Sequence, residues 1–174
     1  LSGANLTYAN LYSSTLTDAN LSGATVTGAN FWDTTSRGFT QAQLASTASY
    51  QAKNLSGISL AGNNLSGWDF SGQVVTGAQL YSSPGFTKEQ LYSTASYQAH
   101  DLTGIRFGGS FTGANFVGQN LTSAHFEYTT LIGANFHQAN LTNATVQADL
   151  TNANLSQANL MNANFSNSYS PPVN

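Results

Sequence analysis

Large apolar residues recur every five positions along most of the chain. In the longest run, from Leu102 to Phe165, the spacing is five except for two steps of four. A small residue, most often alanine, lies two positions before most of these large residues. A helix would spread this pattern around its axis, and a flat strand would place successive large residues on opposite faces. The backbone is therefore predicted to turn a corner once in each unit.

A square coil satisfies this spacing. If each unit forms one side, the large residue and the alanine two positions earlier both point inward, because side chains i and i−2 of an extended stretch share a face. Four units then close one coil of about 20 residues, and successive coils stack roughly 4.8 Å apart through backbone hydrogen bonds. The two four-residue steps, Phe107 to Phe111 and Val146 to Leu150, are predicted to be tightened corners.

The repeat units carry a family resemblance. The segments ANLTYANL, GANFHQANLTNATV and TNANLSQANLMNANF resemble the pentapeptide-repeat family, whose consensus is A-(D/N)-L-x-x. The resemblance covers nearly the whole chain apart from two insertions. It implies an all-β fold, the right-handed quadrilateral β-solenoid, and it indicates little about function. We therefore expect a single pentapeptide-repeat solenoid over residues 1–174.

Two insertions interrupt the repeat, at about 32–49 and 81–96, and their sequences resemble each other at an offset of 47 residues. Each contains the T-x-x-Q spacing of a capping box, at Thr40 and at Thr87. Short helices are predicted near 41–48 and 88–95. We expect them to lie against the outside of the solenoid, held by four apolar side chains, Phe39, Leu44, Phe86 and Leu91.

Several positions depart from the repeat. Lys53 and His100 occupy the small inward position, and because a buried lone charge is costly, both are expected to reach solvent. Pro171 and Pro172 lack the N–H needed for a ladder, so they are expected to end the stacking. The chain starts at Leu1 already in repeat phase, which predicts a processed product or a piece of a longer chain, with an open edge on its first coil.

Composition narrows the function classes. Charged residues make up 6% of the chain and the net charge is −3, so no strong field steers the protein toward nucleic acid or acidic lipid. There is no cysteine, which excludes disulfides and thiolate chemistry and fits an exported protein as well as a cytoplasmic one. No apolar run approaches the roughly 18 to 20 residues that cross a bilayer.

No constellation of residues supports catalysis. The seven acidic residues are scattered, and the serines have no base beside them in the pattern. His125 and Glu127 flank Phe126 and are predicted to be a solvated surface pair rather than a metal site. The sequence therefore predicts no catalytic residue, no metal and no cofactor.

The outer faces are the candidate contact surfaces. The coil register stacks Tyr12 over Trp32, and it aligns Thr103, Thr122 and Thr142 in one column. Regular columns offer a natural contact surface, although neighbouring aromatic residues on a sheet are also ordinary cross-strand stabilisation.

Three functions are compatible with these features. The first is a non-enzymatic structural or protein-interaction module, exported or associated with the cell surface, that binds a protein or a surface polymer or assembles end to end with its own copies. The second, implied by the family resemblance, is a DNA mimic that binds DNA gyrase, although seven acids offset by four bases match phosphate spacing poorly. The third is binding of ice or a surface polymer through the threonine columns.

Overall fold

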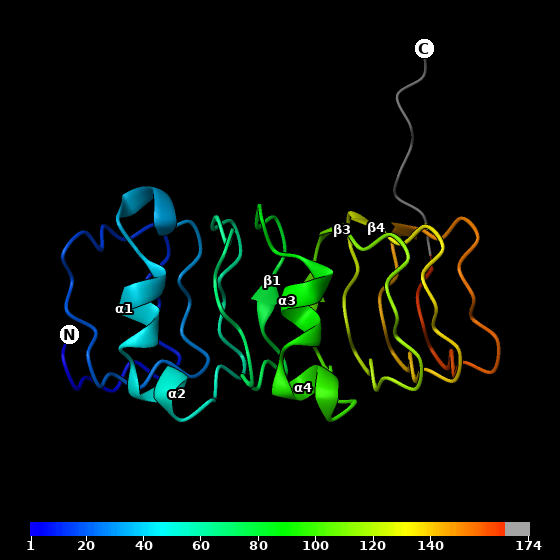
Figure 1. The fold of residues 1–174 in the computed structure, drawn as a ribbon, viewed down its shortest axis with the longest axis horizontal. Coiled ribbons are helices and arrows are strands. Elements are labelled where there is room, and N and C mark those ends of the chain that lie inside the picture. Colours follow the sequence, from blue (N-terminus) through cyan, green and yellow to red (C-terminus); the bar gives the residue numbers. More distant parts are fainter. Residues whose placement is uncertain (166–174) are drawn as a thin grey trace, which may run out of the picture.

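The computed structural model describes residues 1–165, which wind into an elongated β-solenoid with the first and last described coils at opposite ends (Figure 1). Regular elements are few and short, and all sheet pairings are parallel. In chain order, they are a 3-10 helix at Thr35–Arg37, α1 (Gln41–Ala45), α2 (Ala48–Gln51), β1 (Gln79–Leu80), α3 (Lys88–Tyr92), α4 (Ala95–Gln98), β2 (Arg106–Phe107), β3 (Gly109–Ser110), β4 (Thr129–Thr130) and β5 (Ala148–Asp149).

Each five-residue unit consists of a four-residue turn and one extended residue. In the unit that starts at Leu6, Ala9 N donates to Leu6 O at 2.9 Å, and Tyr8 adopts a left-handed φ of 58°. The extended residue that follows, Asn10, pairs with Asn30 of the next coil. Its side-chain oxygen accepts a hydrogen bond from the N–H two residues later, which is the local bond that makes asparagine favourable at turns.

The interior is a continuous column of Leu, Phe, Val and Ala side chains. In the later coils Phe116 stacks on Phe136 with ring centroids 4.9 Å apart, and Phe126 meets Phe136 edge to face at 5.7 Å. All three rings are fully buried, as are the inward alanines Ala124 and Ala134. The inward assignment of both repeat positions is therefore confirmed here.

The coil register changes at the irregular segments. Uninterrupted coils pair residues 20 positions apart, as in Asn5 with Thr25. The first insertion lengthens the step to 29 (Asn30 with Ser59), and the second lengthens it to 27 (Gln79 with Arg106). The expected tightened corners are wrong in detail. The four-residue steps contain β3 and β5, so extended strands absorb the missing residue and the register falls to 19.

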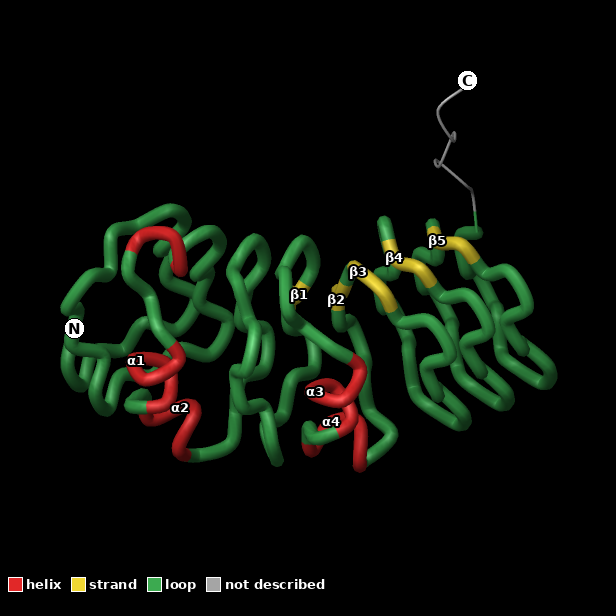
Figure 2. Tube along the Cα trace, turned by 45° about the horizontal axis from the view of Figure 1, so that its top comes forward, coloured by secondary structure: helices red, strands yellow, loops and turns green. Residues whose placement is uncertain are grey.

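The helix-start predictions are confirmed, because Thr40 with Gln43 and Thr87 with Gln90 form capping boxes at α1 and α3. Each predicted helix is nevertheless two short helices. α1 ends at Ala45, and Thr47 caps the start of α2, where its side chain accepts a hydrogen bond from Tyr50 N. The backbone changes direction between the two helices. Figure 2 shows the two helix pairs on the same side of the coil, separated by the intervening coils.

The insertions do more than cover the outside, in contrast to the sequence-based expectation. Phe39 stacks on Phe31 with centroids 4.6 Å apart, and Phe86 packs edge to face against Phe70 at 5.7 Å. Leu44, near the end of α1, is also fully buried. The insertions thus supply core residues to the coils that they interrupt.

The expected exposure of Lys53 and His100 is confirmed. Both residues adopt a left-handed φ, and the Lys53 ammonium group donates to Ser71 O at 3.1 Å. A different inward substitute, Asn63, is fully buried, and its amide bonds the backbone of residues 31, 34, 35 and 60. The proposed stop at Pro171 and Pro172 lies outside the described residues.

Removing one buried ring tests the packing of the interior column. We expect Phe136→Ala to lower the free energy of unfolding by about 3–5 kcal/mol, because it leaves a cavity between two packed rings. The control is Met161→Ala, at a side chain that is 59% exposed, with an expected change within about 0.5 kcal/mol. Urea unfolding followed by circular dichroism measures both. Similar losses in the two variants would contradict the inward assignment of Phe136.

A glycine of the first insertion offers a second test. Gly38 has a φ of 90°, and a Cβ there would lie 2.6 Å from Thr17 Cα, whereas a Cβ at Gly113 (φ 65°) would meet nothing within 4 Å. Both alanine variants carry left-handed strain, but only Gly38→Ala forces the backbone apart. We expect Gly38→Ala to be about 1–3 kcal/mol less stable than Gly113→Ala. Equal denaturation midpoints would show that the insertion does not approach the first coil this closely.

Candidate interaction surface

Five side chains from five coils form a continuous row on one lateral face. Tyr12 meets Trp32 edge to face with ring centroids 5.8 Å apart, and Trp32 meets Tyr81 in the same way at 5.2 Å. The Arg106 guanidinium lies 5.1 Å from the Tyr81 ring centroid, and its Nη2 is 2.9 Å from Glu127 Oε2. We call these five residues the aromatic row.

Small residues in the intervening coil leave the space in which Trp32 can contact Tyr81. The coil between them presents Ala61 and Gly62 at the corresponding outer positions. A Cβ on Gly62 would lie 2.7 Å from Trp32 Nε1, so only glycine leaves room for the indole there. The ring therefore spans a whole coil to reach Tyr81.

The charged end of the row is partly shielded from water. Arg106 and Glu127 have side chains that are 33% and 32% exposed, so their ion pair adds little stability. Two buried nitrogens beside it, Arg106 Nε and His125 Nδ1, have no hydrogen-bond partner among the described residues. Buried polar atoms are usually satisfied in native proteins, so this cluster is not fully explained by the stability of the fold.

The environment of Tyr81 alters its acidity. Burial raises the pKa of Tyr81 above its ordinary value of 10.0, and this effect exceeds that of Arg106, which lowers the pKa. Glu127 acts in the same direction as burial. The hydroxyl is therefore protonated, and the ring neutral, across the physiological range.

A pocket of about 320 Å³ opens beside the charged end of the row. We call it the lateral pocket. Residues 107–109 and Ser82 form part of its wall, and the other lining residues are aromatic or ionisable: Trp32, Tyr81, Tyr128, Arg106, His125 and Glu127.

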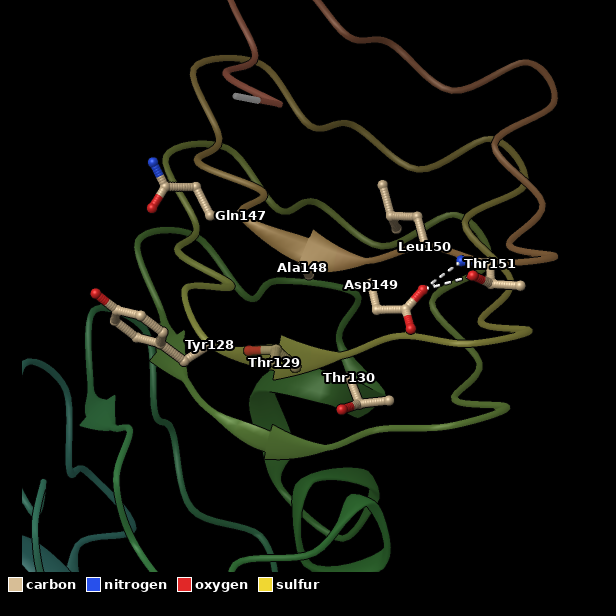
Figure 3. Close-up of a pocket in the computed structure, with 8 residues that line it drawn as sticks. All are labelled: Tyr128, Thr129, Thr130, Gln147, Ala148, Asp149, Leu150 and Thr151. Carbon is tan, nitrogen blue, oxygen red and sulfur yellow. Dashed lines mark hydrogen bonds between the residues drawn. The ribbon is translucent and has the colours of Figure 1, made fainter. Parts of the chain in front are cut away.

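A second hollow, of about 520 Å³, lies over β4 and β5 and shares Tyr128 with the lateral pocket (Figure 3). We call it the sheet hollow. Asp149 accepts hydrogen bonds from the N–H and the hydroxyl of Thr151, at 3.0 and 2.6 Å. Both bonds hold the pKa of Asp149 below its usual range, and the bond from the Thr151 hydroxyl has the larger effect. Tyr128, drawn in Figure 3 at the edge of the hollow, is 82% exposed.

The threonine column that the sequence singled out lies in three successive coils. Each threonine hydroxyl donates to an oxygen of the side chain two positions earlier, and asparagine amides link one coil to the next. These donor bonds are Thr103 to Asp101, Thr122 to Asn120 and Thr142 to Asn140. The hydroxyl protons are thus engaged within the protein.

Metal-binding side chains do not cluster in the part of the chain that the structure describes. Within residues 1–165, no group of three or more His, Asp or Glu side chains is placed to hold a metal ion. His125 Nδ1 and Glu127 Oε1 are 3.6 Å apart, which makes a loose pair. None of the helices in the described part of the chain is long and apolar enough to span a membrane.

Sequence reasoning found one end of the aromatic row and missed the other. Tyr12 and Trp32 are 20 residues apart, so the regular register brings them together. Tyr81 and Arg106 lie beyond insertions that change the register to 29 and 27. The one available signal was that Tyr81 directly follows the inward Leu80, as Trp32 follows Phe31.

Comparisons with known proteins agree with this architecture. The chain matches the family described as pentapeptide repeats, with eight copies, over residues 1–33, 110–147 and 146–167, which together exceed half its length. No curated protein matches the chain.

The solved structures that are similar to the chain include two pentapeptide repeat proteins from cyanobacteria. HetL, a pentapeptide repeat protein involved in heterocyst differentiation regulation in the cyanobacterium Nostoc sp. strain PCC 7120, is 23% identical over 94% of this chain, with a TM-score of 0.36. The pentapeptide repeat protein Rfr23 from the cyanobacterium Cyanothece 51142 is 23% identical over 64%, with a TM-score of 0.24. The aligned regions span 65% and 55% of those two proteins.

The raised pKa of Tyr81 predicts an alkaline loss of stability. Below the unfolded value of 10.0 the stabilisation is fully present, and it is lost as pH rises through the higher folded pKa, because the unfolded state releases its proton first. We expect the free energy of unfolding to fall less steeply above pH 10.0 in Tyr81→Phe than in the wild type. Urea unfolding across this pH range measures both slopes, and identical slopes would contradict the burial of Tyr81.

Proposed function

The chain belongs to the pentapeptide repeat family, and from this premise we propose that it is a non-enzymatic interaction module whose contact surface is the aromatic row. The observation that carries the proposal is the unbroken contact from Tyr12 to Glu127 across the coils. Tyr, Trp and Arg are the residue types enriched at binding hot spots. The partner is a protein or a surface polymer.

We propose one solenoid domain over residues 1–174, right-handed and quadrilateral, with the helix-bearing insertions at about 32–49 and 81–96 built into it. Support comes from the five-residue units, four to a 20-residue step. An export or cell-surface location draws support from the low charge of the chain.

Three alternatives have narrower support. End-to-end assembly draws on the parallel pairing between coils and on the exposed Leu160 and Met161 of the last described coil. A DNA mimic that binds gyrase needs free acids, but Glu127 is paired and Asp149 accepts bonds from Thr151. Binding of ice through Thr103, Thr122 and Thr142 must compete with the internal bonds of those hydroxyls.

Capture of the partner tests the proposal. Immobilised wild type, Trp32→Ala and Tyr8→Ala are each incubated with an extract of the source organism, and the recovered material is compared. Tyr8 is exposed on the first coil outside the row, which makes it the matched control. We expect a component that binds wild type and Tyr8→Ala and is lost with Trp32→Ala, because the indole links two parts of the row.

Equal recovery by all three forms would contradict a role for the aromatic row. Thermal melts verify that Trp32→Ala is folded. A parallel concentration series by light scattering decides the end-to-end alternative, since a constant mass supports lateral binding and a growing mass supports assembly through the coil ends.

A further inference from the structure

We propose that the lateral pocket binds one ring of a neutral polysaccharide. The inference rests on the proposed function, because it names the chemical class of a partner at the charged end of the aromatic row. It starts from a pocket whose walls combine aromatic rings with paired hydrogen-bonding groups: Trp32, Tyr81, Tyr128, Arg106 and Glu127.

The charges in the wall favour a neutral ligand. Arg106 Nη2 and Glu127 Oε2 lie 2.9 Å apart, so their charges cancel within the wall. A cationic ligand would have to compete with the Arg106 guanidinium, which already lies over the Tyr81 ring. An anionic ligand would meet the Glu127 carboxylate. The same two groups still offer N–H donors and carboxylate oxygens, which suits the hydroxyl groups of a sugar.

The size and lining of the pocket fit a single sugar ring. Its volume of about 320 Å³ lies at the lower end of the usual range for small-molecule sites, roughly 300–1,000 Å³. A pyranose has apolar C–H faces and a polar rim. Aromatic side chains with an apolar body and a polar tip accommodate both kinds of surface.

Tyr128 places an exposed aromatic ring at the rim of this pocket. It adopts a left-handed φ of 59°, a conformation in which glycine and asparagine are the favourable residues. Its side chain is 82% exposed and lies outside the buried core. An equally exposed tyrosine with the same φ, Tyr8, lies outside the pocket, so what distinguishes Tyr128 is its place at the rim, where its ring can stack on a ligand.

The sheet hollow, next to the lateral pocket, offers a path for the rest of a polysaccharide chain. Tyr128 lines both the lateral pocket and the sheet hollow. In the sheet hollow, exposed Asp149 and Thr151 present further polar atoms. A chain whose one ring occupies the lateral pocket would pass over Tyr128 toward β4 and β5 (Figure 3).

Affinity electrophoresis tests the inference directly. The full chain is run through native gels that contain a soluble neutral glucan, mannan or xylan, or heparin as the acidic control. We expect at least one neutral polysaccharide to retard the wild type. Tyr128→Gly should weaken that retardation by about tenfold, as expected for the loss of one stacked aromatic contact. Tyr128→Gly also relieves the left-handed strain, so it should melt no lower than the wild type.

Tyr8→Gly is the matched control, because Tyr8 has a φ of 58° and the same 82% exposure but lies outside the pocket. It should be retarded like the wild type. The inference is overturned if no neutral polysaccharide retards the protein, if only heparin does, or if Tyr128→Gly and Tyr8→Gly behave alike. The proposed function would still stand after any of these outcomes if Trp32→Ala abolishes the capture of a protein partner.

Discussion

The structure depends on one constraint: the large side chain at every fifth position points into the coil, while the backbones of successive coils form hydrogen bonds in parallel register. Each unit closes a four-residue turn, as in Ala9 N to Leu6 O, and its extended residue bonds the next coil. Burying each Leu or Phe contributes about 1.5–3 kcal/mol. With no disulfide in the chain, this column and its hydrogen bonds hold the fold together. Because each coil contacts mainly its neighbours, the outer side chains are free to vary.

The insertions connect this constraint to the proposed contact surface. They alter the number of residues per coil without breaking the stack, because Phe39 and Phe86 take core positions that a regular unit would have filled. The altered register aligns Trp32 with Tyr81, which are separated by 49 positions in the sequence. Gly62 then gives the indole the space to cross the intervening coil. The aromatic row is thus a product of the coil lengths as much as of the residues in it.

The sequence was sufficient for the parts of the structure that follow the repeat. The inward residues, the 20-residue register and both capping boxes could all be predicted, because each depends on contacts at a fixed spacing. The break of each helix at a threonine such as Thr47 and the burial of Phe39 could not, since they depend on the path of the insertion. Tyr81 and Arg106 were missed for the same reason. Thr122 was placed correctly in its column, but the engagement of its hydroxyl by Asn120 is visible only with side chains.

A nuclear Overhauser contact between the Trp32 indole and the Tyr81 ring is the most direct test of this account. The two rings meet only if the first insertion sets the coil register described above, and their centroids are then 5.2 Å apart. We predict cross-peaks between the two rings, alongside cross-peaks between Trp32 and Tyr12. Cross-peaks to Tyr12 without any to Tyr81 would contradict the register across the insertion, and with it the continuity of the aromatic row.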